Sequence, residues 1–364
     1  MTSTKLEDGL ELALQNIDSG AKKARNITIM KRYFGFDGMG GSSMEEAGRD
    51  FELTRESVRQ ITNRISSAFP SALPLVPAIQ DAIKIIGEMM PCAASDAEKK
   101  LFELGFISKD FKIEGVINAG KCFGLITSEA EIIKLNDVRF IVSPAHQGLP
   151  KAIHSKAIKD ISHNGAVSVQ ELAKLASGAS DESALLLVNR IIESMDFVKW
   201  IDEDKNWFYF NGRGRNRLVS RLNKIFSVLN HVPVKSLMSG IERSWSKNLK
   251  ENTALLPVEQ MVNLVKSLNG FSVDEDIISR EGGEHYNEEV RPFEMAIVEY
   301  INSKEDKIAK EKEIEDAIVM NVQDKYNYSM ALNYSPLFMK RERPEGSPEG
   351  RYFRGQYVLI GSMR

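Results

Sequence analysis

Cysteine is scarce in this chain of 364 residues, which has only Cys92 and Cys122. Two cysteines do not make the disulfide framework of a small secreted domain, and they do not supply the ligands of a zinc site. We therefore expect both to be small, buried apolar side chains in a reducing compartment.

Long apolar runs are also lacking. No stretch approaches the roughly 18 consecutive apolar residues that a transmembrane helix needs. The start of the chain, MTSTKLEDGLELAL, has no basic segment followed by an apolar one, so it is unlike a secretory signal. These absences predict a soluble, cytoplasmic protein with no membrane partner.

Motifs for catalysis and metal binding are absent as well. The five histidines are scattered, and none falls in an HExxH-like or His-Cys spacing. No GxSxG nucleophile motif occurs. The glycine-rich stretch DGMGG at 37–41 lacks the Lys-Ser/Thr pair of a phosphate-binding loop, and no strand is predicted before it. We expect neither enzyme activity nor a metal or cofactor.

The charge of the chain is distributed unevenly. Its net charge is −3, with 42% hydrophobic and 27% charged residues, values that are ordinary for a globular protein. Residues 22–64, however, hold nine Lys and Arg against six Asp and Glu, a net of +3. Contact with a nucleic acid is therefore expected through a local patch and not through the whole surface.

Two short helices joined by a tight turn are predicted within residues 43–64. Ser43 and Thr54 are each placed to cap a helix, the first over about residues 44–51 and the second over about 55–65. Glu46, three residues after Ser43, completes a capping box. Small residues at 47 and 48 would let the two helices cross closely. This pattern is typical of a helix-turn-helix.

The second helix is predicted to expose polar side chains that can read bases. They are Arg55, Glu56, Arg59, Gln60, Asn63 and Arg64. Arg can bind guanine bidentately, Gln and Asn can bind adenine, and Glu can accept a hydrogen bond from cytosine. We interpret this face as a DNA-reading surface. A protein-binding or purely structural two-helix unit with a solvated charged face is the alternative.

Two stretches resemble a known family. RYFGFDG at 32–38 and SMEEAGRDFELTRESVRQITNRI at 43–65 are similar to the C-terminal promoter-recognition domain, region four, of bacterial RNA polymerase sigma factors. That family has an RFG(I/L) stretch, a short variable loop and a T-LEEVG-x-x-F-x-V-TRERIRQI run. The resemblance covers about residues 20–68 and makes DGMGG the variable loop.

The resemblance implies that Arg55, Glu56, Arg59 and Gln60 read an upstream promoter element and its backbone. It also makes RNA polymerase a candidate partner, because region four docks on that enzyme. Ser57 departs from the family, which usually has Arg there, so one DNA contact would be lost and the preferred sequence would differ. No segment for promoter melting is recognisable, so a complete initiation factor is not expected.

The remainder of the chain is predicted to be mainly α-helical with small β-hairpins. Three helices followed by a hairpin recur, which indicates tandem winged-helix-like modules. The last module, with YSPLFMK and GQYVLIG, resembles winged-helix domains fused to DNA-associated bacterial proteins. The predicted domains are a sigma-like unit at 1–70 and modules at 75–145, 150–212, 215–282 and 288–364.

Three finer predictions concern these modules. Ser95 is expected to cap a helix that runs to about residue 104. Ile158 is expected to point inward from the helix at 151–163. Trp200 and Trp207 are expected to pair across a hairpin.

A second basic cluster lies between two predicted modules. It consists of Arg213, Arg215, Arg217, Arg221 and Lys224, without intervening acid. Such a cluster at the start of a helix can hold phosphates. A solvated helix between domains is the alternative.

Together these observations predict a sequence-specific transcription regulator that binds double-stranded DNA through the helix starting at Arg55. The alternative is a protein-interaction scaffold, or an accessory subunit of a DNA-processing or phage-defence system. Candidate partners besides DNA are RNA polymerase, a second copy of the chain and another protein.

Overall fold

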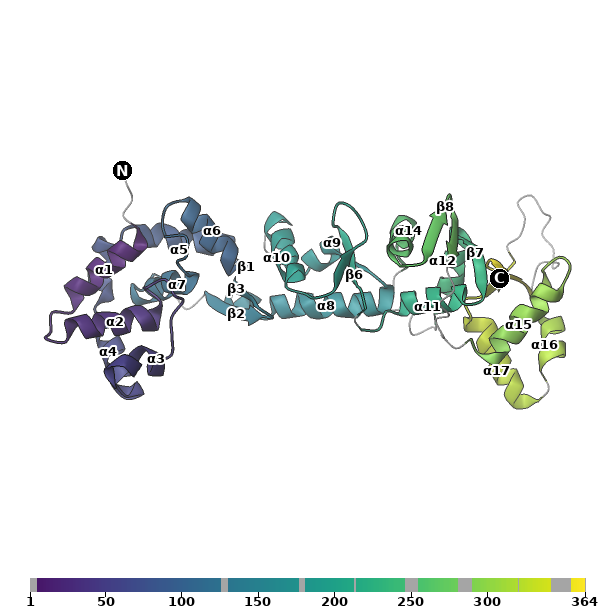
Figure 1. Ribbon diagram of the computed structural model, residues 1–364, viewed down its shortest axis with the longest axis horizontal. Helices are drawn as coiled ribbons and strands as arrows, with labels where there is room; N and C mark the ends of the chain where they lie inside the picture. Colours follow the sequence, from purple (N-terminus) through teal and green to yellow (C-terminus); the bar gives the residue numbers. More distant parts are fainter. Residues whose placement is uncertain are drawn as a thin grey trace. The chain divides into compact units, whose positions relative to one another are not determined.

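The computed structural model describes residues 5–125, 130–176, 181–212, 214–245, 255–280, 290–319, 321–341 and 355–363. The chain divides into two compact units. The first contains Met1–Ser155 and Gln170–Asp196, and the second contains Lys156–Val169 and Phe197–Arg364. The described chain is mainly helical with small antiparallel sheets, which confirms the predicted secondary-structure class (Figure 1).

The chain begins with four α-helices. They are α1 (Leu6–Ile17), α2 (Lys23–Phe34), α3 (Met44–Gly48) and α4 (Arg55–Ser66). Short 3₁₀ helices follow α3 at Arg49–Phe51 and α4 at Phe69–Leu75. The helix α2 ends at Gly35, whose φ of 75° suits the left-handed conformation that often ends a helix.

From residue 78 onward, the described elements repeat the order helix, strand, helix, helix, strand, strand. The first repeat is α5 (Ala78–Met89), β1 (Cys92–Ala93), α6 (Ala94–Glu103), α7 (Ile113–Cys122), β2 (Glu131–Leu135) and β3 (Val138–Val142). The second is α8 (Leu149–Asn164), β4 (Val167–Ser168), α9 (Val169–Ala173), α10 (Asp181–Glu193), β5 (Val198–Trp200) and β6 (Trp207–Phe210), with a 3₁₀ helix before it at Pro144–His146.

The third repeat is α11 (Arg217–Phe226), β7 (Leu229–Pro233), α12 (Val234–Arg243), α14 (Val258–Ser267), β8 (Phe271–Asp274) and β9 (Ile277–Arg280). The fourth is α15 (Pro292–Ser303), β10 (Ala309–Lys310), α16 (Glu311–Ile318), α17 (Val322–Tyr334), β11 (Phe338–Lys340) and β12 (Gln356–Leu359). In every repeat the third strand lies between the first and the second, in antiparallel pairing.

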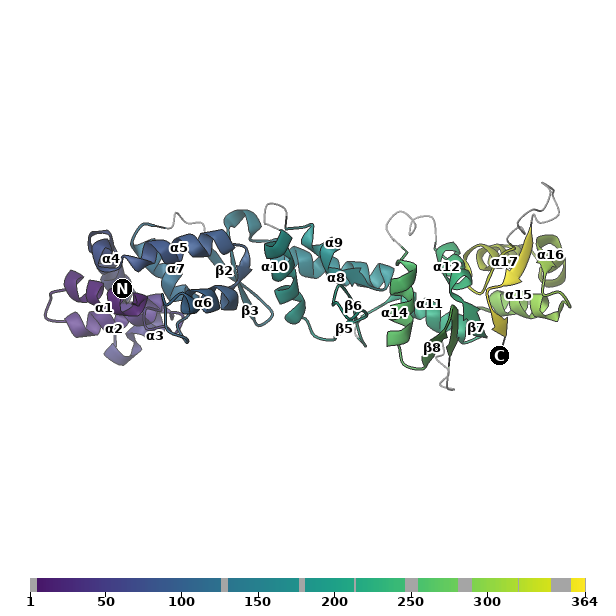
Figure 2. The same cartoon turned by 90° about the horizontal axis from the view of Figure 1, so that it is seen from above.

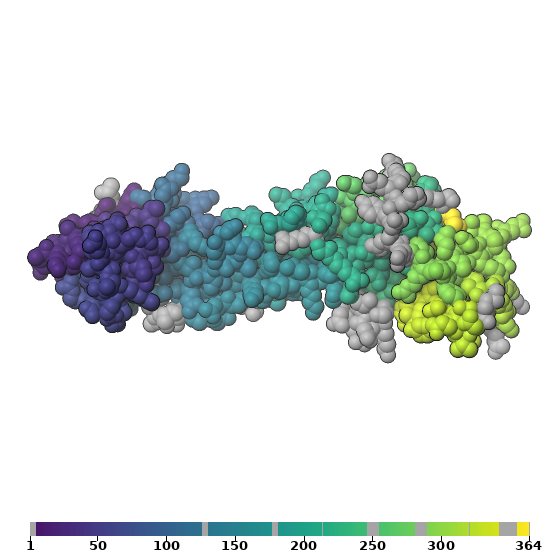
Figure 3. Space-filling view, turned by 60° about the horizontal axis from the view of Figure 1, so that its bottom comes forward, coloured from purple at the N-terminus to yellow at the C-terminus, as the bar shows by residue number. Residues whose placement is uncertain are grey.

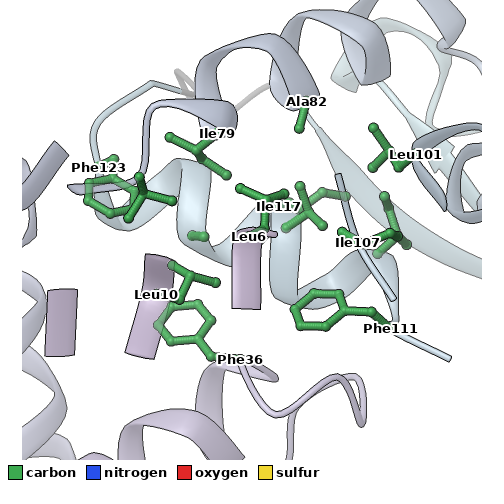
Figure 4. Packing of buried hydrophobic residues seen from close by; sticks show 14 of the residues in the cluster. Leu6, Leu10, Phe36, Ile79, Ala82, Leu101, Ile107, Phe111, Ile117 and Phe123 are labelled. Carbon is green, nitrogen blue, oxygen red and sulfur yellow. The ribbon is translucent and has the colours of Figure 1, made fainter. Parts of the chain in front are cut away.

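One hydrophobic core joins the N-terminal helices to the first repeat. Leu6 and Leu10 of α1 and Phe36 pack in the same cluster as Ile117 and Phe123, which belong to α7 and its end (Figure 4). The backbones also approach closely, because a Cβ at Gly115 of α7 would lie 2.4 Å from the carbonyl oxygen of Gly35. The helices α1 and α2 are therefore packed against the first repeat.

The second unit is tied together by contacts between its third and fourth repeats. The final strand, β13 (Ser362–Met363), pairs with β7 of the third repeat. Lys224 and Glu294 form a 2.6 Å ion pair in which the Glu294 side chain is 4% exposed. Figure 2 shows α15, α16 and α17 gathered beside β12. The four boundaries between the five predicted domains stay a prediction, and these contacts cross the one expected at about residue 285.

Three sequence predictions within these elements are wrong. Ser95 lies inside α6, whose N-cap makes no side-chain hydrogen bond because β1 runs directly into the helix. Ile158 is 47% exposed. Trp200 lies opposite Phe208 and not Trp207, and its ring packs on Phe208 with centroids 5.4 Å apart.

Candidate nucleic-acid interface

The two helices of the predicted helix-turn-helix begin with the expected caps. The Ser43 hydroxyl accepts a hydrogen bond from the Glu46 backbone N–H, and the Glu46 carboxylate accepts one from the Ser43 backbone N–H. At α4, the Thr54 hydroxyl accepts from the Ser57 backbone N–H at 3.2 Å. Each cap satisfies amide groups that have no partner within the helix, and so fixes where the helix starts.

The turn between α3 and α4 depends on a close approach of the two helices. A Cβ at Gly48 would lie 2.6 Å from Cγ2 of Val58, so glycine is needed for α3 to cross α4 at this distance. Ala47 and Val58 form a small separate core with Ile29 of α2. This packing holds α4 by one face on α2 and α3.

The opposite face of α4 is exposed to solvent. The helix buries Val58, Thr62 and Ile65. The six predicted base-reading side chains, Arg55, Glu56, Arg59, Gln60, Asn63 and Arg64, are all exposed. Figure 3 shows the α3 and α4 region of the first unit in indigo, facing the viewer. The structure therefore gathers the predicted residues of this helix on one surface.

Three of these side chains form a hydrogen-bonded network. Arg59 donates from Nε to one Glu56 oxygen at 2.8 Å and from Nη2 to the other at 2.6 Å. Gln60 Nε2 donates to the same carboxylate at 3.2 Å. These hydrogen bonds, chiefly those from Arg59, lower the pKa of Glu56 to about 2, and Glu56 in turn raises the pKa of Arg59.

The other two arginines of α4 have looser partners. Arg55 lies 3.5 Å from Glu45, with 74% of its side chain exposed. Arg64 lies 3.7 Å from Asp18, a carboxylate that is 4% exposed. The Arg55–Glu45 pair is exposed on both sides, and such pairs stabilise a fold by about 0–1 kcal/mol. Arg55 can therefore exchange its partner for a ligand at little cost, whereas Arg64 faces a buried carboxylate.

A hollow of about 610 Å³ lies beside α4 and brings in two residues that sequence reasoning missed. Lys22 and Arg25, at the start of α2, line it together with Gln60 and Arg64 of α4. The Arg25 guanidinium donates to the amide oxygen of Asn26 at 3.0 Å, a neutral acceptor. The local excess of positive charge was visible in the sequence. That the basic residues of α2 lie beside those of α4 depends on how the two helices pack.

The second basic cluster is not assembled into one surface. Arg215 is exposed, whereas Arg221 donates from Nε to the Ser244 hydroxyl at 2.5 Å inside the second unit. Lys224 is paired with Glu294, as described above. Arg217 is partly buried. The pKa of His163 is lowered first by the burial of His163 and next by the charge of Arg217. Arg213 lies outside the described residues.

Other site chemistry is sparse in the described chain. Among its residues, no cluster of three or more His, Cys, Asp or Glu is arranged to hold a metal ion. The two cysteines are free, and burial raises the pKa of both thiols to about 12. Over the same residues, no helix has both the length and the apolar character that crossing a membrane requires.

Comparison of the chain with protein-family models and with curated proteins gave no match.

Proposed function

We propose that the protein is a sequence-specific DNA-binding transcription regulator that inserts α4 into the major groove. The observation that carries this proposal is the exposed face of α4. Its side chains match the donors and acceptors of base edges, while the opposite face is fixed on α2 and α3. The major groove admits one α-helix, and Arg, Gln and Glu recognise guanine, adenine and cytosine respectively.

We also propose a setting for this helix. The helices α3 and α4 form a sigma-region-four-like helix-turn-helix, which makes RNA polymerase a candidate partner. The four repeats are winged-helix-like modules, an assignment supported by their common strand order. The protein acts in the cytoplasm, and Arg215 and Arg217 are candidates for further phosphate contacts.

Charge reversal on α4 tests the proposal. In a gel-shift assay with a mixed pool of duplexes, Arg55→Glu and Arg59→Glu are expected to weaken binding at least about tenfold, because each removes a donor pair and places a carboxylate against DNA. Lys84→Glu and Lys99→Glu are the matched controls, since both side chains are exposed on α5 and α6 of the same unit.

The controls are expected to leave affinity within about twofold of wild type, because a distant exposed charge is largely screened. Duplex affinity that is the same in all four variants and in wild type contradicts DNA reading by α4.

A different observation favours a second candidate function, a protein-interaction scaffold or accessory subunit. Val322 and Tyr326, four residues apart on α17, are 88% and 62% exposed. Tyr326 borders a hollow of about 500 Å³ that Phe293 and Met330 also line. Large exposed apolar side chains of this kind are common at protein interfaces. Unchanged duplex affinity in the Arg55 and Arg59 variants would favour this function.

A further inference from the structure

Glu56 stands at the centre of the exposed face of α4. Its two carboxylate oxygens accept three hydrogen bonds, two from Arg59 and one from Gln60. Both Glu56 and Arg59 are more than half exposed, so the contact is made on the surface that would face DNA. A single acidic side chain thus engages two of the candidate base-reading residues.

The contact uses one particular edge of the Arg59 guanidinium. Nε and Nη2 each donate one N–H to Glu56. A guanidinium has five N–H groups in a fixed plane, so both N–H groups of Nη1 and one of Nη2 are left. The remaining Nη1–Nη2 edge has the parallel donor pair that binds O6 and N7 of guanine. The carboxylate therefore restricts the orientation of Arg59 and leaves its end-on edge open.

The contact also changes the charge that α4 presents. Attraction to phosphates is independent of sequence and depends on uncompensated positive charge. The carboxylate of Glu56 neutralises the charge of Arg59 at hydrogen-bond distance. Arg55, in contrast, has one ion-pair contact with Glu45, at the longer distance of 3.5 Å. Bidentate, charge-assisted pairing is the stronger and more directional of the two.

From this geometry we propose that Glu56 is a positioning residue that sets sequence specificity. It aims the free edge of Arg59 at a guanine and lowers the attraction of α4 for the phosphates of any sequence. The inference rests on the proposed DNA-binding function.

The test compares wild type with Glu56→Gln and with Glu45→Gln, a matched control that removes the same charge beside Arg55. A duplex selected by wild type from a random pool and a random-sequence duplex are titrated by fluorescence anisotropy at several salt concentrations. Each guanine of the selected duplex is then replaced in turn by 7-deazaguanine, which lacks the N7 acceptor. Thermal unfolding of each variant checks that it is folded.

One 7-deazaguanine position is expected to weaken wild-type binding about tenfold, the loss of a bidentate contact. Glu56→Gln is expected to reduce that loss to about threefold or less, while Glu45→Gln keeps it. Glu56→Gln is also expected to bind the random duplex several-fold more tightly. The slope of its log affinity against log salt concentration is expected to become steeper by about one unit.

The inference is overturned if Glu56→Gln and Glu45→Gln reduce the preference for guanine over 7-deazaguanine equally. It is also overturned if no 7-deazaguanine substitution weakens wild-type binding. In both cases a wild type that still prefers its selected duplex leaves the proposed function standing. A wild type that binds every duplex equally, or none, removes the proposed function itself.

Discussion

At Gly48 a single hydrogen atom in place of a side chain sets the distance between α3 and α4. Gly48→Ala places a methyl group about 2.6 Å from Val58 Cγ2. We expect a destabilisation of about 1–3 kcal/mol, the usual cost of overpacking. Urea unfolding of the full chain measures it.

Gly87→Ala is the control for that substitution. Gly87 lies within α5, and a Cβ there would have no neighbour within 4 Å. We expect it to stabilise the helix by about 0.5–1 kcal/mol, since alanine restricts the unfolded chain more than glycine does. Equal effects of the two substitutions would show that the crossing at Gly48 is looser than described.

His163 gives the second unit a dependence on pH. Burial and the nearby cations Arg217 and Lys159 lower its pKa below the ordinary 6.5. A group whose pKa is lowered in the fold binds its proton more readily when unfolded, so its stabilising contribution is complete above about pH 6.5 and is lost as the pH falls towards the folded-state value.

We expect His163→Gln to show a smaller fall in urea midpoint between pH 7.5 and pH 5.5 than wild type. The midpoints are followed by tryptophan fluorescence, since Trp200, Trp207 and Trp245 all belong to the second unit. An unchanged difference between the two pH values would contradict the described environment of His163.

Some residue-level features were predictable from the sequence because they are local. The caps at Ser43 and Thr54 depend on neighbours within three residues. The partner of Trp200 was not predictable, because it depends on the register between β5 and β6. The Glu56–Arg59 contact has the i, i+3 spacing of neighbours on a helix and could have been found from spacing alone.

At the scale of elements, helices and the strands of hairpins were predictable, and strands of two residues were not. The helices predicted at about residues 44–51 and 55–65 agree with α3 and the 3₁₀ helix that follows it, and with α4, within about a residue. The strands β1 and β10 have two residues each, which is too short for any period, and each exists because a later strand pairs with it. The packing of α7 on the end of α2 likewise depends on contacts between distant segments.

The junction between α12 and the fourth repeat depends on Arg243. Its guanidinium donates to the carbonyl oxygens of Leu332, Ser335 and Phe338, and it lies over the Phe338 and Tyr357 rings. Burial lowers the pKa of Arg243 to about 10.

We expect Arg243→Lys to destabilise the second unit by about 1–3 kcal/mol, because lysine lacks the planar fork that reaches several carbonyls at once. Urea unfolding measures the change. The exposed Arg291→Lys serves as the control and is expected to stay within about 0.5 kcal/mol of wild type. A similar value for both variants would mean that the Arg243 contacts contribute little.

At the scale of the whole molecule, the sequence predicted recurring modules but not the contacts that join them. The recurrence follows from the repeated order of helices and hairpins along the chain. The pairing of β13 with β7 joins the end of the chain to the third repeat, a contact with no local signal. The core shared by α1, Phe36 and α7 is of the same kind, because apolar patterning identifies a buried face but not its partner.

Selection of bound duplexes from a random pool measures whether α4 reads a DNA sequence. We predict that the full chain enriches one recurring sequence. We further predict that Gln60→Ala enriches the same sequence with relaxed preference at one or two positions, a loss of about 1–3 kcal/mol of discrimination. A wild-type chain that enriches no sequence over the starting pool would contradict sequence reading by α4.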